Sequence, residues 1–311
     1  MNSINSKYSV SLERIRAAVQ FEKVDKTPVS INGPAFIANA QGVPLKEYIT
    51  DFPRAVTKAL ECLDALGEVE SAQSAIMSPY GLCRQWLSPV AVPGVELPDN
   101  EPWQVMEAET IQEEDYDKIE EMGFYNFVDW LLKNRLNDPD SKMVMYNQYK
   151  PTAIQRFAEN GYVILNHFSL VTPFEHICGG RSLCSFLADD LCEEPEKVEK
   201  VFKIIRDESI PRYEKQLKEQ RPFGVWVGGW RSSPNFISPA FFDRFVWPYL
   251  YEYTMLASRY GAVPTFHLDG NWDFAMEYFK EFPPRSCIMS LDGTTDIRHA
   301  RAVLGDHMCL M

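Results

Sequence analysis

Several features are missing from this 311-residue sequence, and each absence excludes a class of protein. It has no run of about 18 apolar residues, which a membrane-spanning helix needs. Its first eleven residues are polar, unlike a secretory signal. Positive charge is scarce, because 31 Lys and Arg stand against 44 Asp and Glu, for a net charge of -13. That balance repels nucleic-acid backbones and anionic lipid, so neither nucleic acid nor a membrane is an expected partner.

Sequence signals of disulfide, nucleotide and serine-hydrolase sites are also missing. The seven cysteines are scattered, odd in number and without a C-x-x-C pair. This usage is typical of reduced, mostly buried cysteines, so we expect a cytoplasmic protein. No P-loop, G-x-G-x-x-G or Ser-His-Asp signature occurs.

Short apolar runs alternate with helical patterns in the last third of the chain. Strands are predicted at 223–229, 264–270, 287–293 and 307–311, with helices at 238–261, 272–282 and 296–304 between them. This order predicts right-handed βαβ units and parallel pairing. With further strands at 28–33 and 161–166, the predicted fold class is α/β, a (β/α)8 TIM-type barrel with an N-terminal helical and β-rich extension. A doubly wound open sheet is the alternative, but no dinucleotide fingerprint follows the first strand.

No repeat or low-complexity linker divides the chain, so we predict a single barrel domain over residues 1–311. From residue 69 to about residue 140 the pattern breaks up. Tryptophans, prolines and short alternating pieces come first, and charged helices follow. We interpret this stretch as an excursion over one face of the barrel.

Alternation along the last strands places ionisable groups toward the barrel interior. In Pro264–Gly270, Phe266 and Leu268 face out toward helices, whereas His267 and Asp269 face in. The same count makes Cys309 and His307 inward in the last strand and brings Asp292 near Asp269. In a barrel these groups would gather at the C-terminal mouth, where such folds carry their chemistry.

Imidazole, carboxylate and thiolate groups together form a plausible Zn2+ site on His267, Asp269 and Cys309, with one position open for water or substrate. Each residue also has a plainer explanation. A single inward His is more often a hydrogen-bonded core or substrate residue. A single buried Cys is usually inert, and Asp before Gly is common in turns.

Other candidates carry weaker signals. Trp226, Gly229 and Trp230 are predicted to form a substrate wall, because glycines allow close approach and indoles supply flat surfaces. Asn32 faces inward on the first strand and is a further substrate-binding candidate. A cluster in a predicted loop after the second strand could line the pocket or lie on the surface; its members are His167, Glu175, His176 and Cys178.

Three stretches together resemble the uroporphyrinogen decarboxylase superfamily. They are the segment 14–29 with Val-Asp-Lys-Thr-Pro-Val, the segment 237–249 beginning Ile-Ser-Pro, and His-Leu-Asp-Gly-Asn at 267–271 with the later Gly-Asp-His-Met-Cys-Leu at 305–310. The resemblance spans nearly the whole chain and implies a TIM-type barrel. Decarboxylases of the superfamily grip substrate carboxylates with N-terminal arginines, and residues 28–34 contain none.

The resemblance is greater to the cobamide-dependent methyltransferase branch, which holds zinc with a His-x-Cys pair and a distant Cys. His267 and Cys309 match the outer positions, and Asp269 replaces the middle Cys. O-demethylase methyltransferases of this branch are similar and vary their zinc ligands. An oxygen substrate suits the Asp better than a thiol substrate. Members of the branch usually continue through a final helix, so we also expect that the chain is shortened after Met311 or that the barrel closes unusually.

The sequence therefore favours a zinc-dependent methyltransferase with His267 and Asp269 as catalytic residues. It would move a methyl group from a methyl ether, with a methoxylated aromatic favoured, to the Co(I) corrinoid (cobamide) of a separate carrier protein. One alternative is a metal-free decarboxylase-like lyase acting on a carboxylated ring. The other is a non-catalytic barrel that binds a corrinoid or tetrapyrrole. Barrels of this kind often pair, so a homodimer is expected.

Overall fold

The computed structural model describes residues 6–311, and residues 1–5 of the polar N-terminal segment lie outside the described residues. The chain divides into two compact units, which are described in turn. The first comprises the described residues up to 83 together with 89–106 and 138–165, and the second comprises 84–88, 107–137 and 166–311. The single barrel domain over residues 1–311 stays a prediction. Within residues 6–311, none of the helices has the length and apolar character of a bilayer-spanning helix.

A three-stranded parallel sheet in the order β1-β2-β5 runs through the first unit. Its strands are β1 (Ser30–Ile31), β2 (Ser71–Ala72) and β5 (Val163–Ile164). Ser30 pairs with Ser71, which pairs with Val163. A separate antiparallel pair joins β3 (Val90–Ala91) to β4 (Gln104–Val105).

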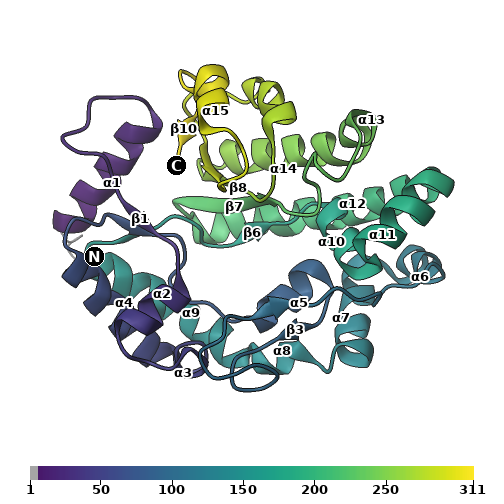
Figure 1. The fold of residues 1–311 in the computed structure, drawn as a ribbon, viewed down its shortest axis with the longest axis horizontal. Helices are drawn as coiled ribbons and strands as arrows, with labels where there is room; N and C mark the ends of the chain where they lie inside the picture. The colour runs from purple at the N-terminus through teal and green to yellow at the C-terminus, as the bar shows by residue number, and fades with distance from the viewer. Residues whose placement is uncertain (1–5) are drawn as a thin grey trace. The chain divides into compact units, whose positions relative to one another are not determined.

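The first unit also contains several helices. They are α1 (Ser6–Val19), α2 (Pro34–Ala40), α3 (Leu45–Tyr48), α4 (Phe52–Leu66), α8 (Pro139–Lys142) and α9 (Val144–Glu159). Asp51 caps α4 by accepting the backbone N–H of Arg54, and Gly67 ends the helix with a φ of 84°. The apolar face of α4 is buried, and α9 packs beside it (Figure 1).

The second unit is built on a five-stranded parallel sheet in the order β10-β9-β8-β7-β6. Its strands are β6 (Ser169–Leu170), β7 (Gly224–Gly229), β8 (Val263–Leu268), β9 (Ile288–Leu291) and β10 (Cys309–Leu310). The predicted order of strands and helices after residue 220 and the parallel pairing are confirmed. The described residues thus contain two parallel sheets, one of three strands and one of five.

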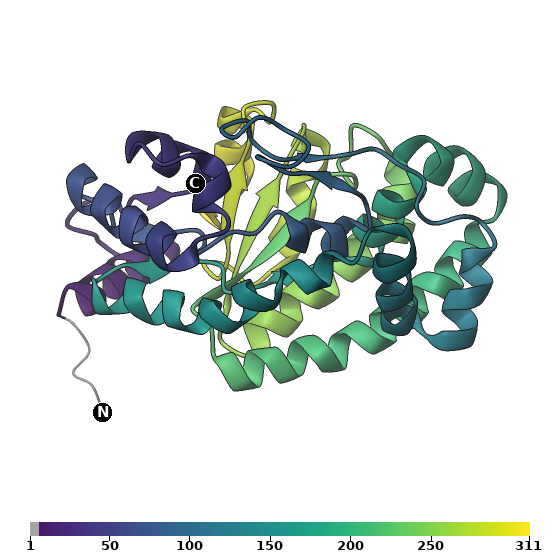
Figure 2. The same ribbon diagram turned by 90° about the horizontal axis from the view of Figure 1, so that it is seen from below.

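The second unit also contains many helices, and Figure 2 shows a layer of green helices beside its strands. They are α6 (Asp115–Met122), α7 (Phe124–Arg135), α10 (Pro173–Arg181), α11 (Leu183–Ser185), the π-helical η1 (Phe186–Leu191), α12 (Pro195–Gln220), α13 (Pro239–Phe241), the π-helical η2 (Phe242–Val246), α14 (Trp247–Arg259), the 3-10 helix η3 (Asp273–Glu281) and α15 (Ile297–Leu304). Helix α14 packs on β7 and β8. On β8, Phe266 is fully buried against Phe279 and Phe282, with ring centroids 5.0 and 5.4 Å away. These contacts explain why the outward positions of β8 are apolar.

Several short elements differ from the sequence predictions. Helices α2 and α3 and strand β6 were not predicted, because elements this short give little periodic signal. Residues 69–107 contain a strand of the parallel sheet, β2, and helix α5 (Tyr80–Trp86) besides the β3–β4 pair. The inward position predicted for His307 is wrong. Strand β10 begins only at Cys309, and His307 Nε2 lies 2.8 Å from the carbonyl oxygen of Phe282.

Candidate functional site

The candidate site lies at the C-terminal end of β8. His267 is the next-to-last residue of β8, and Asp269 is the first residue after the strand. Phe266 and Leu268 are buried toward the helices, so alternation turns His267 to the other side. The turn that follows needs Gly270, because its φ of +85° is one that residues with a Cβ rarely adopt. The local sequence therefore presents imidazole and carboxylate groups at one strand end.

The structure brings His267 and Asp269 together. His267 Nε2 lies 3.4 Å from Asp269 Oδ1, and the two side chains are 33% and 45% exposed. The other ring nitrogen, Nδ1, is buried and has no hydrogen-bond partner among the described residues. A buried polar atom without a partner is costly, and a bound group that supplied one would be favoured. The pair can hold a cation or exchange a proton with a bound molecule.

Trp226 provides a flat aromatic wall beside His267. In the β7–β8 register, Trp226 pairs with Thr265 and Gly228 pairs with His267. The ring centroids of Trp226 and His267 are 6.4 Å apart, with a tilt of 36°. A Cβ on Gly228 would lie 1.7 Å from the Trp226 ring, so the indole occupies the space that a side chain at 228 would need.

The two other residues of the predicted substrate wall have packing partners of their own. A Cβ on Gly229 would lie 2.3 Å from the Trp272 indole, so this glycine allows close packing against Trp272. Trp230 packs edge-on against Trp86, with ring centroids 5.2 Å apart, and the Arg231 guanidinium lies 4.5 Å from its ring. Their contact with a substrate stays a prediction.

Asp292 supports the turn after β8. Its Oδ2 accepts the backbone N–H of Gly270 at 2.8 Å, and its Oδ1 accepts the N–H and hydroxyl of Thr294. Partial burial opposes ionisation of Asp292, but these hydrogen bonds outweigh it and hold the pKa of the carboxyl below its usual value. Asp292 thus lies near Asp269, as predicted, and its oxygens are engaged by the backbone.

Cys309 lies on the same face as His267 but at a different level. It pairs with Ile288, which pairs with Thr265, so it is two strands from β8 and one side-chain step below His267. That offset corresponds to about 10 Å across the sheet and 6–7 Å along the strands. Burial raises the pKa of the Cys309 thiol, which is therefore protonated near neutral pH without a metal.

The fit of these residues to zinc is partial. Within residues 6–311, no three His, Cys, Asp or Glu side chains are grouped closely enough to hold a metal ion. His267 and Asp269 supply two suitable ligand side chains, and the Nδ1 atom of His267 has no hydrogen-bond partner among the described residues. Cys309 is not grouped with them, so the three-ligand zinc site stays a prediction.

The predicted loop containing Glu175, His176 and Cys178 is in fact the helix α10, in which all three are buried. The expectation of a loop was therefore wrong. Thr172 in extended conformation followed by Pro173 at the first position is a recognisable helix start, and sequence reasoning overlooked it. The Glu175 carboxylate contacts residues 230–232, which follow β7.

His176 makes the fold sensitive to acid. Burial lowers the pKa of this imidazole to about 4, from an ordinary value of 6.5. As the pH falls below 6.5, His176 becomes protonated in the unfolded chain, whereas in the folded protein it stays neutral until about pH 4. The free energy of unfolding therefore falls across this range. This difference between the two pKa values corresponds to about 3 kcal/mol of folding free energy.

We expect His176→Phe to remove this part of the pH dependence in urea unfolding at pH 7 and pH 4.5. Replacement of the exposed His299 by alanine should leave the pH dependence unchanged. Equal slopes in wild type and His176→Phe would contradict the assignment.

Asn32 belongs to the first unit, where it follows β1. With Tyr48 and Phe157 it lines a cavity of about 20 Å³, which has room for about one water molecule. The role of Asn32 in substrate binding stays a prediction.

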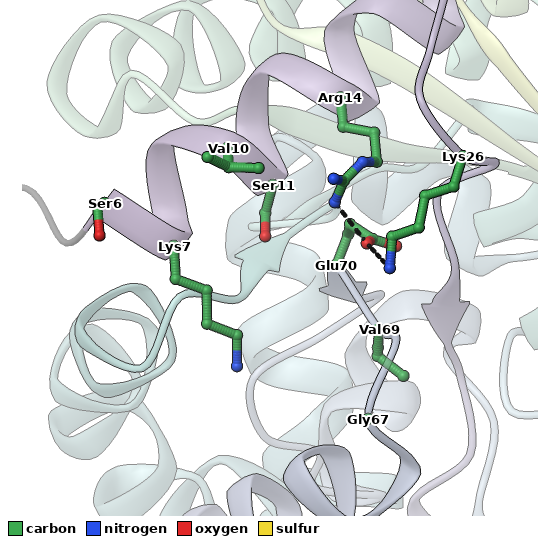
Figure 3. Close-up of a pocket in the computed structure, with 9 residues that line it drawn as sticks. All are labelled: Ser6, Lys7, Val10, Ser11, Arg14, Lys26, Gly67, Val69 and Glu70. Atoms are coloured by element: carbon green, nitrogen blue, oxygen red, sulfur yellow. Dashed lines mark hydrogen bonds and ion pairs between the residues drawn. The ribbon is translucent and has the colours of Figure 1, made fainter.

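A larger cavity of about 310 Å³ also lies in the first unit, beside α1. Figure 3 shows Arg14 and Lys26 pointing at the Glu70 carboxylate, at 2.8 and 3.0 Å. Glu70 is almost fully buried and also accepts the N–H of Val29. Arg14 also pairs with Asp25 at 2.6 Å, so two cations face two carboxylates, and we assign the cluster a structural role.

Parallel strands, covering helices and polar groups at the C-terminal strand ends define the chain as an α/β protein of the TIM-barrel class. Comparison with known families agrees. The family model of uroporphyrinogen decarboxylase (URO-D) matches residues 154–311, half of the chain. The chain belongs to this family, whose fold is a TIM barrel, and the predicted fold class and superfamily are confirmed.

A solved structure has the same fold over nearly the whole chain. It is a methyltransferase from Methanosarcina mazei, with a TM-score of 0.66 and 18% sequence identity. The alignment covers 96% of this chain and 81% of that chain. No curated protein matches the sequence significantly. At this identity the likeness concerns the fold.

Proposed function

We propose that this protein is a methyltransferase that removes a methyl group from a methyl ether, with a methoxylated aromatic as the favoured donor. The methyl acceptor would be the Co(I) corrinoid of a separate carrier protein. The His267–Asp269 pair, with a buried and unpartnered ring nitrogen, carries the proposal. The fold shared with a methyltransferase and the absence of arginine from residues 28–34 support it.

The reaction breaks the bond between the methyl carbon and the ether oxygen and forms a bond from that carbon to cobalt. The bonding electrons stay with the oxygen, and the resulting phenolate takes a proton. Because phenolate is a poor leaving group, charge on this oxygen must be stabilised as the bond breaks. His267 and Asp269 lie together at a strand end, where they can face that oxygen.

In the proposed site, His267 and Asp269 would hold a zinc ion, with Cys309 as the third ligand. A bound zinc ion would supply Lewis-acid polarisation of the ether oxygen. The chain's own residues would orient the donor, and Trp226 offers an aromatic surface 6.4 Å from the His267 ring for this purpose. Placement of the two reactants then supplies much of the rate enhancement.

A decarboxylase-like lyase is the second candidate, favoured by the family model that matches residues 154–311. In that reaction His267 and Asp269 would act as a general acid and base without a metal. Such a reaction needs cationic groups for the substrate carboxylates, and residues 28–34 supply no arginine. We therefore rank it below methyl transfer.

The test combines metal analysis with an assay of methyl transfer from methoxylated aromatics to Co(I) cobalamin, followed by the visible spectrum of the cobalt. We expect about one zinc per chain and catalytic turnover. Cys309→Ala is expected to lose zinc. Cys287→Ala should keep zinc, because Cys287 lies one residue before β9 and on the face of the sheet opposite to Cys309. Protein without zinc that instead releases CO2 from a carboxylated ring would favour the lyase. Binding of the corrinoid without turnover would favour the non-catalytic alternative.

A further inference from the structure

Glu175 on α10 is fully buried and surrounded by hydrogen-bond donors. Its Oε1 accepts the backbone N–H groups of Trp230 and Ser232, both at 3.0 Å, and the Ser232 hydroxyl at 2.7 Å. Its Oε2 accepts the Trp86 indole N–H at 3.2 Å and the Arg231 N–H at 3.3 Å. Five donors therefore converge on one carboxylate, and three of them are consecutive backbone groups after β7.

Consecutive backbone N–H groups that point to one centre form a concave anion site. Here the protein's own carboxylate fills it, so the conformation of residues 230–232 depends on Glu175. Loops seldom have such a strong internal constraint, because their backbone groups usually face water. A carboxylate that accepts several backbone N–H bonds forms charge-assisted bonds, which are about twice as strong as neutral ones.

The constrained loop also touches the turn that carries Asp269. A Cβ on Gly270 would lie 2.7 Å from the Ser233 hydroxyl oxygen, so the loop backs directly on this turn. Ser233 is itself fully buried. The Asp269 N–H donates to the Gly229 carbonyl at 3.0 Å, and the Trp272 indole N–H donates to the Asp269 carbonyl at 2.9 Å. Loop 229–233 and the end of β8 thus form one packed unit.

We propose that Glu175 is a positioning residue, which fixes the backbone of residues 230–232 and thereby sets the turn that holds Asp269 beside His267. The inference concerns the geometry of the site that the proposed function uses. It requires neither the identity of the methyl donor nor a metal.

The test is the indole region of the 1H–15N spectrum of the deuterated full-length protein, in wild type and Glu175→Gln. Glutamine keeps the size and one acceptor oxygen but turns an NH2 group toward two of the donors. Trp86→Phe and Trp272→Phe assign the two reporter signals. We expect both indole signals to move by more than a line width in Glu175→Gln. The Trp86 indole donates directly to Glu175, and the Trp272 indole donates to the Asp269 carbonyl. The signal of Trp130, on α7, should stay in place.

Glu208→Gln is the matched control, since Glu208 also accepts two backbone N–H groups in the same unit, from Phe124 and Tyr125. It should leave the Trp272 signal unmoved. A folded Glu175→Gln protein with an unmoved Trp272 signal would overturn the proposal. If Glu175→Gln does not fold, Ser232→Ala removes a single donor and is judged by the same criterion.

An activity measurement separates this inference from the proposed function. If the protein transfers methyl groups, Glu175→Gln is expected to lower kcat about 10- to 100-fold, as loss of groups that orient site residues does. KM for the donor should change less, because Glu175 is buried away from solvent. If the wild type transfers no methyl group, the proposed function fails while the Trp272 signal still decides the role of Glu175.

Discussion

Replacing His267 with alanine is expected to remove both bound zinc and methyl transfer. The imidazole is one of the two proposed donors that the structure brings within 3.4 Å, and its buried Nδ1 has no partner among the described residues. Loss of a ligand should cost more than the 10- to 100-fold that loss of a supporting group costs. Metal analysis and the cobalt assay measure the two losses separately.

His299→Ala is the matched control, because His299 is an exposed histidine on α15 whose Nε2 lies 3.3 Å from the Asp273 carbonyl oxygen, away from the proposed site. It should keep both zinc and activity. Asp269→Asn should weaken zinc binding, since the amide oxygen is a poorer ligand than a carboxylate. Full activity in His267→Ala would refute the proposed site. Loss of activity in His267→Ala, with no zinc in the wild type, would indicate acid–base catalysis instead.

Replacing Asp190 with asparagine is expected to destabilise the second unit by about 3–5 kcal/mol. Asp190 and Arg181 are both nearly fully buried and form two hydrogen bonds, of 2.8 and 3.0 Å. Tyr116 donates its hydroxyl to the same carboxylate. Asparagine would leave the arginine charge buried without a counter-charge, which is the costly part of breaking such a pair. Urea unfolding at pH 7 measures the change.

Asp207→Asn provides the comparison, because its pair with Arg206 is 2.7 Å long but largely exposed. That variant should lose at most about 1 kcal/mol. The double variant Arg181→Met with Asp190→Leu should be more stable than Asp190→Asn, because no charge is then left unpaired. A loss below about 1 kcal/mol in Asp190→Asn would show that water or a rearranged side chain compensates the arginine.

Local patterns were sufficient to predict much of the second unit. Alternation with a period of two made Phe266 and Leu268 outward and His267 inward, and the structure buries the first two against helices. The order of strands after residue 220 followed from runs of the right length bounded by glycine and helical segments. These features depend on neighbours in the chain, and the sequence records them directly.

Strand register was not available from alternation. The pattern in residues 307–311 correctly predicted the face of Cys309 but not its level, because side chains two residues apart share a face. Pairing of Cys309 with Ile288 then places it below His267. The third proposed zinc ligand therefore depends on a register that only the assembled sheet defines.

The sequence by itself determined the α/β class, the parallel order of β7 to β10 and the pairing of His267 with Asp269, because each follows from residues close together in the chain. The tertiary structure alone decided which segments distant in the chain meet. Glu175 meets donors from residue 86 and from residues 230–232, which are 89 and 55–57 positions away. A single glutamate among apolar residues carries no local signal of such partners. A buried carboxylate needs hydrogen-bond donors, and only the folded chain determines which residues supply them.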